Sequence, residues 1–358
     1  MKKGNTEGVA QTVGLDVGDR FTFFCVLEQD SGEMVEEGRV RTTREALRRR
    51  FGGQPRMRIA LEVGPQSPWM SRLLEDLGHE VIVANARRVA LIHGNARKQD
   101  QVDAESLARL ARVDPKLLSG IVHSSEIVQV DRAVLRSRDV LVRSRAGLIN
   151  HVRGTAKAMG HPLPQCSAPS FAKRVVEEIP SPLSPALAPV LEQIATLTDS
   201  IRAYDRELEA MAAERYPETE LLAQVDGVGL LTALGFVLKL GTPSRLRRNR
   251  MAGPYLGLVP RRDQSGARDP QLRITKTGDA YVRRLLVGSA HYILGPFGPD
   301  CDLRRYGERM TQRGGKNAKK RAVVAVARKL AVLLLHLWRN AEVYDPLYSE
   351  RANKSKAA

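Results

Sequence analysis

The stretch "TVGLDVGDRFTFFCVLEQDSGEMVEEGRV", residues 12–40, decides the fold of the N-terminal part of the chain. Apolar residues alternate with other residues on both sides of a glycine turn, which predicts two neighbouring strands. The polar group "QDSGE" then predicts a hairpin into a third strand. A single acid, Asp16, lies within the first of these strands.

Strands alternate with helices after this opening. We expect helices in "TREALRRRF" (43–51) and "SPWMSRLLEDLG" (67–78), and strands in "RMRIALEVG" (56–64) and "HEVIVANA" (79–86). Three strands followed by β-α-β order predict an α/β domain with a mixed sheet over residues 1–120.

A basic helical and coiled-coil region is predicted over residues 121–215. One long basic helix is expected over residues 125–159, and a second carries apolar residues three and four apart. This pattern fits either a coiled coil between two copies of the chain or an antiparallel hairpin with the preceding helix. The residues of the expected seam are Leu187, Val190, Ile194, Leu197, Ile201, Tyr204, Leu208 and Met211.

Residues 216–345 are predicted to form a third, mainly helical domain, and residues 346–358 a flexible polar tail. The turn "VDGVG" at 225–229 lies between two apolar helical segments. Glycines in such a turn let backbone N–H groups face a phosphate, as in helix-hairpin-helix DNA binders. A purely structural helical hairpin is the alternative.

The net charge bounds the class of partner. The 358 residues carry a net charge of +17 with a pI near 10.1, so a polyanion such as nucleic acid is the expected partner. We expect no membrane, because Arg328 and Lys329 interrupt the longest apolar run and the first residues lack a signal-peptide core. Three distant cysteines predict neither a disulfide framework nor a zinc site. A cytoplasmic protein is expected.

Four acids form the first candidate site. Asp16 in "GLDVG" and Glu62 in "ALEVG" lie within apolar strands, where a carboxylate is costly unless it is paired or bound to metal. Asp100 and Asp103, three residues apart, share one face of a helix, although a cap and a solvated acid are the alternative. Oxygen ligands alone suit Mg²⁺ or Mn²⁺, and two such ions about 4 Å apart can act on a phosphodiester. The placement predicts a ribonuclease H-like nuclease core.

"GLDVG" also resembles a phosphate loop of actin-like sugar kinases. Those proteins need a later D-x-G-G loop, and the sequence has none.

A lone serine forms the second candidate site. Ser265 lies in "PRRDQSGARDPQLRITKTGDAYVRRLL", residues 260–286, where a plain turn is the alternative to a nucleophile. Surrounding cations could hold a phosphate during its displacement, which favours phosphoryl transfer. These cations are Arg261, Arg262, Arg268, Arg273, Lys276, Arg283 and Arg284. Further nucleic-acid contacts are expected from Arg136, Arg143, Arg145, Arg153, Lys316, Lys319 and Lys320.

Taken together, the motifs resemble a known family. "GLDVG", "LEVG" with "SPW", "VIVANARRVALIHGNARKQDQVDAESLARL", "VDGVGLLTALGF", "YLGLVPRRDQSG" and "ITKTGDAYVRRLLV" occur in the order and spacing of the bridge-RNA-guided DEDD transposases of bacterial insertion sequences. The resemblance covers about residues 10–295 and both candidate sites.

The resemblance implies a RuvC-like (RNase H-like) domain, a coiled-coil region and a transposase domain. It implies that Asp16, Glu62, Asp100 and Asp103 bind metal and that Ser265 attacks DNA to form a phosphoserine. It also implies a noncoding guide RNA that pairs with donor and target DNA, a composite site from two protomers of a dimer or tetramer, and a nucleoid-associated bacterial protein. The chain departs from the family pattern at Val63, Gln99 and Asp279.

Two other functions stay open at this stage. A DEDD endonuclease or junction resolvase would use water and would not need Ser265. A nonenzymatic nucleic-acid-binding protein would use the basic helices alone. Loss of function on replacing Asp16 or Asp103 by Asn separates enzymes from the binder, and a covalent protein–DNA adduct separates the two enzymes.

Overall fold

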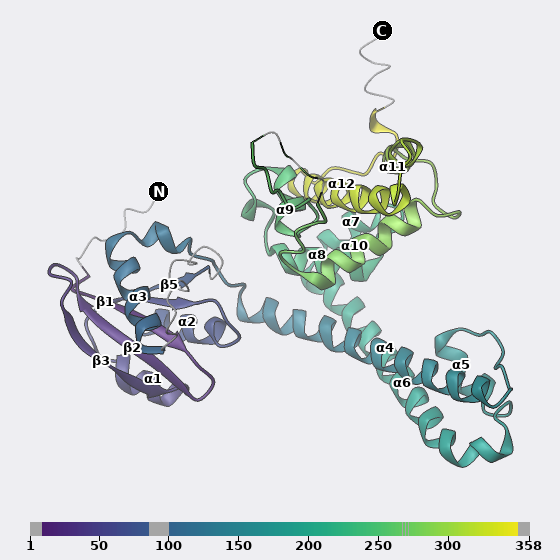
Figure 1. Ribbon diagram of the computed structural model, residues 1–358, viewed down its shortest axis with the longest axis horizontal. Coiled ribbons are helices and arrows are strands. Elements are labelled where there is room, and N and C mark those ends of the chain that lie inside the picture. Colours follow the sequence, from purple (N-terminus) through teal and green to yellow (C-terminus); the bar gives the residue numbers. More distant parts are fainter. Residues whose placement is uncertain (1–8, 86–99, 267, 269, 271, 350–358) are drawn as a thin grey trace, which may run out of the picture. The chain divides into compact units, whose positions relative to one another are not determined.

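The computed structural model describes residues 9–85, 100–266, 268, 270 and 272–349. The chain divides into two compact units, Met1–His123 and Ser124–Ala358, and each is described by itself (Figure 1). The sequence predicted three domains and a tail, with its first boundary at residue 120.

The first unit is built on a five-stranded mixed sheet of order β3-β2-β1-β4-β5. The first three strands are antiparallel neighbours, and β4 and β5 run parallel to β1. The strands are β1 (Gln11–Val17), β2 (Phe21–Glu28), β3 (Met34–Arg41), β4 (Arg58–Glu62) and β5 (Glu80–Ala84). The predicted mixed α/β sheet domain is confirmed.

Helices cover both faces of this sheet. α1 (Arg44–Phe51) and α2 (Ser67–Asp76) share a core with one face, which contains Val13 and Leu15. α3 (Asp100–Val113) packs on the other face through small residues. Successive side chains of β1 point to opposite faces of the sheet. Odd-numbered residues therefore face α1 and α2, and even-numbered residues face α3.

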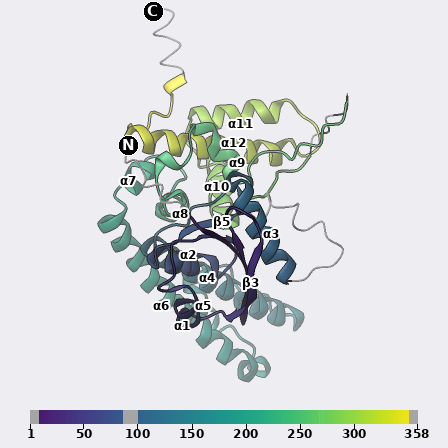
Figure 2. The same cartoon turned by 90° about the vertical axis from the view of Figure 1, so that its left-hand side faces the viewer.

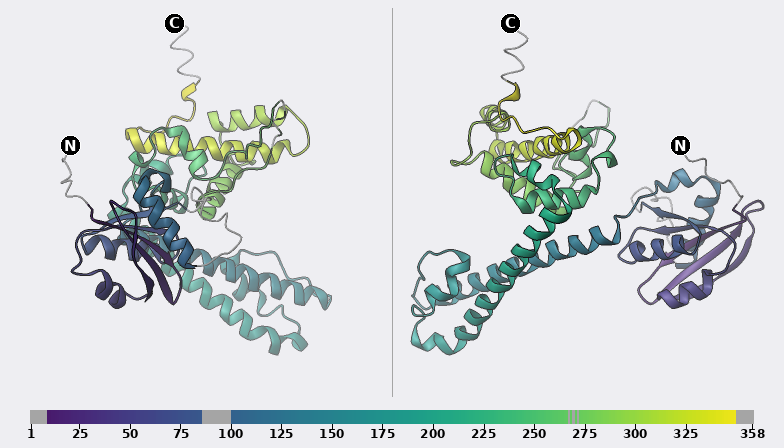
Figure 3. Two further views of the ribbon diagram at one scale, coloured as in Figure 1. Left: turned by 60° about the vertical axis from the view of Figure 1, so that its left-hand side comes forward. Right: turned by 180° about the vertical axis from the view of Figure 1, so that it is seen from behind.

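The second unit begins with a long helical hairpin (Figure 3). α4 (Glu126–Ala158) packs against α6 (Ser184–Arg215), and the short α5 (Phe171–Val175) packs on α6 near its beginning. The intramolecular alternative for the apolar seam is thus the one this chain adopts. The buried residues of α6 are Leu187, Leu191, Ile194, Thr198, Ile201, Leu208, Met211 and Ala212.

The buried stripe of α6 differs from the expected seam. Leu191 and Thr198 are buried, whereas Val190, Leu197 and Tyr204 of the expected seam are half-buried. Both sets step by three and four residues from Leu187, so sequence spacing alone could not separate them. The packing against α4 decides which stripe is covered.

The C-terminal helices form one core around α12, beside which α11 lies (Figure 2). Leu135 of α4 and Leu208 of α6 belong to the same core, so the boundary expected at residues 215 and 216 does not separate two compact units. These helices are α7 (Glu218–Ala223), α8 (Leu230–Leu240), α9 (Ala252–Tyr255), α10 (Ala280–Ile293), α11 (Asp302–Gln312) and α12 (Ala318–Asn340). Short 3₁₀ helices occupy Pro115–Leu118, Ala168–Ser170, Ser181–Leu183, Pro243–Arg245 and Asn249–Met251.

The beginning of the expected tail is attached to α11. The backbone N–H of Asp302 donates to the Pro346 carbonyl at 2.8 Å, and the Ser349 N–H donates to the Asp302 carboxylate at 2.8 Å. Residues 350–358 of that tail lie outside the described residues. None of the helices in the described ranges combines the length and apolarity that a membrane crossing needs.

Candidate functional site

Asp16 and Glu62 lie at the same end of two adjacent strands. β1 and β4 are parallel, and their last paired residues are Leu15 and Leu61, so the two acids are the next residues of each strand. Asp16 lies two positions after Gly14 and therefore on the α3 face of the sheet. Glu62 lies two positions after Ala60, which packs with α3 residues. Both carboxylates thus belong to the carboxyl edge of the α3 face.

Gly14 sets how closely α3 approaches the sheet. A Cβ atom on Gly14 would lie 2.0 Å from the Ala104 carbonyl oxygen and 2.5 Å from the Ala108 nitrogen. Any larger residue would push the helix away, because atoms in a protein core are already in contact. The sequence carried a signal for this contact in the small residues on the buried face of α3, Ala104, Ala108 and Ala111.

The helix runs antiparallel to β1 and β4. Near its C-terminal end, Arg112 donates to the Gln29 carbonyl at 3.0 Å, and Arg58 at the start of β4 donates to the Ala111 carbonyl. Its N-terminal end therefore lies toward the carboxyl edge that carries the first two acids. Asp100 is one turn before Ala104, and Asp103 is one turn before the buried Leu107.

The four acids share one region without forming a closed coordination shell. Asp16, Glu62 and Asp103 are half-buried, and Asp100 is exposed. Within the described residues, no three His, Cys, Asp or Glu side chains are gathered closely enough to hold a metal ion. Their oxygen donors and common edge fit a hard divalent cation in chemical type.

Ser265 lies at the tip of an antiparallel ribbon. Its N–H donates to the Arg268 carbonyl and its carbonyl accepts from the Arg268 N–H, both at 3.0 Å. Gly266, inside this tight turn, has a φ of +54°, which glycine adopts at little cost. Farther down, Arg261 N–H donates to the Arg273 carbonyl at 2.9 Å. The serine is exposed, as a group that meets a macromolecular substrate must be.

The base of the ribbon is fixed by two glycines and one arginine. A Cβ on Gly257 would lie 2.1 Å from the Thr277 carbonyl oxygen, and one on Gly278 would lie 2.2 Å from the Tyr255 carbonyl oxygen. Arg283 donates to the Leu256 and Thr277 carbonyls from the α10 side. The ribbon therefore leaves the core from a tightly specified base and carries its serine outward.

Asp279 anchors the helix that follows the ribbon. Its carboxylate accepts from the Tyr281 and Val282 N–H groups as the N-cap of α10, and both its oxygens accept from Arg136 at 2.6 Å. Burial alone would raise the pKa of Asp279, but the Val282 N–H and the Arg136 charge outweigh it and hold the pKa below its ordinary value. This position is one at which the chain departs from the family pattern.

The predicted nucleic-acid contacts separate into internal and exposed residues. Arg145 is buried between α4 and α6, where it donates to Thr198 and where burial lowers its pKa. Arg153 donates to the Leu163 and Pro164 carbonyls. Arg283 donates to two carbonyls at the ribbon base, so all three arginines contribute to the fold, and their assignment to nucleic-acid binding stays a prediction. Spacing could not reveal this contribution, because arginine serves both purposes.

Three further arginines are paired but accessible. Arg136 bonds Asp279, and Arg143 and Arg284 both bond Asp139. The remaining predicted contacts have exposed side chains, namely Arg261, Arg262, Arg268, Arg273, Lys276, Lys316, Lys319 and Lys320.

A groove brings cations from distant segments together. Its volume is about 1250 Å³, and Arg273 and Lys276 of the ribbon line it together with Lys316, which precedes α12, and Lys320 in the first turn of α12. The groove lies wholly within the second unit, which also contains Ser265, whereas the four acids belong to the first unit. Sequence spacing does not predict this grouping, because some forty residues separate the two pairs of cations.

Comparison with known proteins finds two family models along the chain. The model of the IS110 DEDD transposase domain, described as "Transposase", matches residues 13–160, and the model described as "Transposase IS116/IS110/IS902 family" matches residues 219–298. The first span contains the four acids, and the second contains Ser265 and its ribbon.

Individual relatives agree with these models. The chain is 30% identical over 262 residues to the transposase for insertion sequence element IS1111A of Coxiella burnetii. The aligned residues cover 70% of this chain and 69% of the relative. It is 28% identical over 312 residues to a probable family 20 transposase of Pseudomonas aeruginosa, covering 85% and 90% of the two chains. It is 28% identical over 284 residues to the transposase for element IS1328 of Yersinia enterocolitica, covering 78% and 82%.

Proposed function

The chain belongs to the IS116/IS110/IS902 family of insertion-sequence transposases, and on this premise we propose that it cuts and rejoins donor and target DNA through a phosphoserine at Ser265. Its relatives are named transposases, so DNA transposase activity and DNA binding follow from membership. The phosphoserine chemistry, the guide RNA and the divalent metal are proposals that go beyond membership in the family.

One observation carries the proposal. Within the segment that matches the transposase family, the exposed serine lies at the tip of a ribbon whose base is rigidly specified and whose sides carry exposed arginines. Such a ribbon can present a hydroxyl to a duplex, because the tip is the farthest point from the core. Arg261, Arg268 and Arg273 supply positive charge for the phosphate that the hydroxyl attacks.

The reaction conserves the phosphoester at each step. The Ser265 Oγ–P bond forms as the bond from phosphorus to a deoxyribose oxygen breaks; the hydroxyl proton passes to water and the leaving oxygen takes up a proton. In the second step a DNA hydroxyl attacks the phosphoserine, the Oγ–P bond breaks and Ser265 regains a proton. Rejoining therefore needs no ATP. The cations of the ribbon hold the phosphate and offset the charge that develops on it.

We propose that Asp16, Glu62, Asp100 and Asp103 hold Mg²⁺ or Mn²⁺ for this reaction. The match to the DEDD transposase domain indicates divalent metal use in general, and the four acids offer only oxygen donors from one edge of one sheet face. When bound, the cation would stabilise charge on the phosphate oxygens and favour the ionised hydroxyl. The chain's own part is to hold the acids at that edge through the close contact between Gly14 and α3.

We also propose that a noncoding guide RNA selects donor and target DNA, and that the working unit is a homo-oligomer, either a dimer or a tetramer. The family resemblance and the strongly basic second unit support RNA binding. RNA that copurifies with the protein should be sequenced, and a guide with altered pairing segments should redirect insertion. Fixed target choice in the absence of RNA would contradict guidance.

The covalent step is tested with Ser265→Ala. The wild-type protein should give a denaturant-resistant protein–DNA adduct on DNA that carries the element's ends, and Ser265→Ala should give neither adduct nor cleavage. Ser244→Ala is the matched control, because Ser244 is an exposed serine in a short 3₁₀ helix of the same unit. Strand cleavage that persists without the Ser265 hydroxyl would instead favour a water-using DEDD endonuclease.

A further inference from the structure

An exposed aromatic side chain follows α10. Phe297 is 82% exposed, and Tyr292 in the last turn of α10 is 46% exposed. A single exposed apolar residue is common on protein surfaces and by itself indicates nothing. The surroundings of Phe297 are what distinguish it.

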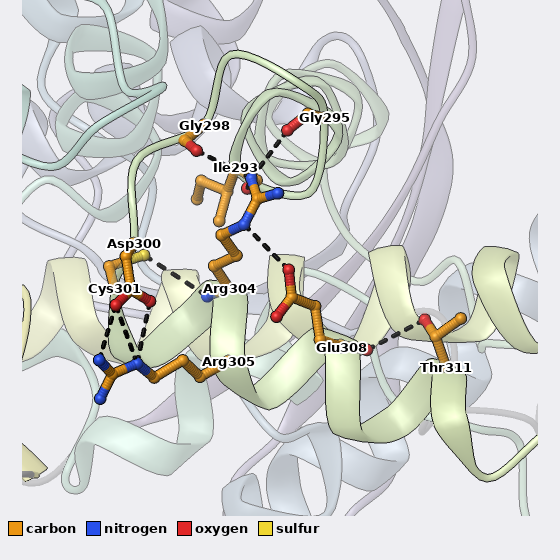
Figure 4. A network of polar contacts seen from close by, with 10 residues as sticks. Ile293, Gly295, Gly298, Asp300, Cys301, Arg304, Arg305, Glu308 and Thr311 are labelled. Carbon is orange, nitrogen blue, oxygen red and sulfur yellow. Dashed lines mark hydrogen bonds and ion pairs between the residues drawn. The ribbon is translucent and has the colours of Figure 1, made fainter.

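The backbone that carries Phe297 is rigidly held (Figure 4). Arg304 donates from one nitrogen to three carbonyls, those of Ile293 at 3.0 Å, Gly295 at 2.7 Å and Gly298 at 2.8 Å. A Cβ on Gly298 would lie 2.3 Å from the Ile293 carbonyl oxygen, so the loop is folded tightly back on the helix end. Proline precedes Phe297 and follows Gly298, which restricts the backbone further.

The orientation of Arg304 is itself fixed. Its Nε donates to Glu308 at 2.9 Å, and the neighbouring Arg305 pairs with Asp300 at 2.6 Å (Figure 4). Three carbonyl contacts from an oriented Arg304 thus hold the backbone of a loop whose one large apolar side chain faces solvent. Binding through a side chain on a held backbone orders only that side chain and costs less conformational entropy than ordering the loop as well.

The elements beside this loop fit a nucleic acid. The predicted helix-hairpin-helix turn lies against the end of α10, because a Cβ on Gly227 would lie 2.8 Å from the Tyr292 ring. A cavity of about 610 Å³ next to the loop is lined by Gly295 and by Lys319 and Lys320 of α12. An amide-rich turn and two lysines can bind phosphates near this loop.

The charge of this part of the chain selects the same partner. Residues 239–339 contain 23 Lys and Arg against six Asp and Glu, so this segment alone accounts for a net charge equal to that of the whole chain, +17. The segment that carries Phe297 is therefore strongly basic, which favours a polyanion over an apolar protein surface as the partner. Aromatic rings beside cations are the usual platform for unstacked bases.

We propose that Phe297 stacks on an unpaired nucleobase while Lys319, Lys320 and the turn at 225–229 bind the adjoining phosphates. Every base has a π-face, so the contact recognises single-stranded character and not sequence. The contact is independent of the serine chemistry. The loop lies at the C-terminal end of α10 and the ribbon base at the N-terminal end, so the 14 residues of the helix separate them by about 21 Å. At 3.4 Å per base pair, this is about six base pairs from the ribbon base.

Binding measurements with four variants test the proposal. Full-length protein is titrated into fluorescein-labelled 30-nucleotide single strands of mixed sequence, one DNA and one RNA, and into the DNA duplex. Phe297→Ala should raise the Kd for a single strand about tenfold, and Phe297→Trp should restore it. Phe297→Leu keeps an exposed apolar side chain without a ring face, so it should bind as weakly as the alanine variant.

The salt dependence separates stacking from charge. Phe297→Ala should leave the slope of log Kd against log salt unchanged, whereas Lys319→Ala should reduce it by about 0.7. A loss on only one of the two single strands supports the proposal and identifies the strand that is bound. Wild-type affinity of Phe297→Ala for both single strands, or wild-type affinity of Phe297→Leu, overturns it, as would an equal loss on the duplex. Melting temperatures equal to that of the wild type establish that all variants fold.

Discussion

Replacing Gly14 by alanine should disable DNA cleavage while leaving the basic second unit intact. The new Cβ would lie 2.0 Å from the Ala104 carbonyl oxygen, and Cβ atoms in proteins essentially never approach closer than 3.0 Å, so the helix must recede by at least 1.0 Å. β1 cannot absorb this shift by itself, because β2 and β4 pair with it on both sides. The shift therefore falls mainly on α3.

The displaced end of α3 carries two of the four acids. Asp100 and Asp103 precede Ala104 within one helical turn, so they move with it relative to Asp16 and Glu62. A displacement of about 1 Å at a reacting site costs about 100-fold in rate. Overpacking of this kind also lowers the free energy of unfolding by about 1–3 kcal/mol.

The assay compares cleavage rate, DNA affinity and melting temperature for Gly14→Ala and Gly120→Ala. Gly120 belongs to the same unit, and its added Cβ would lie 3.6 Å from Ile82, an ordinary contact. We expect a cleavage rate about 100-fold below wild type for Gly14→Ala and a wild-type rate for the control. A folded Gly14→Ala protein that cleaves at the wild-type rate would refute the link between the helix position and the acidic site.

Three further predictions concern arginines and one acid of the second unit. Arg304→Ala removes three carbonyl hydrogen bonds and should lower the free energy of unfolding by about 3 kcal/mol, whereas the exposed Arg309→Ala should change it by less than about 0.5 kcal/mol in thermal melts. Because the pKa of Asp279 is below 3.8 in the folded chain, its charge stabilises the fold above that pH and this contribution is lost as the pH falls through the folded value. The stability advantage of the wild type over Asp279→Asn should therefore shrink between about pH 6 and about pH 3, and a constant difference would contradict the ion pair. Arg273→Ala should reduce the slope of log Kd against log salt for the DNA duplex by about 0.9, because Arg273 is exposed. The change Arg145→Met should leave that slope unchanged, because Arg145 is buried. Equal slopes for both variants would show that exposure does not decide which arginines bind DNA.

Local patterns predicted the elements of the first unit well. Alternation in residues 12–40 and the flanking polar turns specify three antiparallel strands, and the structure has them. The positions of Asp16 and Glu62 within two strands also follow from sequence, whereas their common edge follows from the parallel pairing of β1 and β4. The close approach of α3 does not follow, because the partner of Gly14 lies some ninety residues away in the chain.

Sequence does not separate the two uses of arginine. Arg145, Arg153 and Arg283 look like the exposed arginines in sequence, but each donates to specific acceptors of its own unit, and Arg145 is buried. The seam predicted on α6 differs from the buried stripe for a similar reason, because two helical stripes of equal spacing share Leu187. Only the position of the neighbouring helix decides between them.

Mass spectrometry of the protein–DNA adduct shows which residue carries the DNA phosphate. Trypsin should release residues 263–268, "DQSGAR", because arginine precedes Asp263 and ends the peptide. After reaction with DNA carrying the element's ends and nuclease digestion, we expect the nucleotide phosphate on Ser265 of this peptide. Cleaved DNA with an unmodified peptide, or an adduct on any other residue, would contradict the proposed phosphoserine.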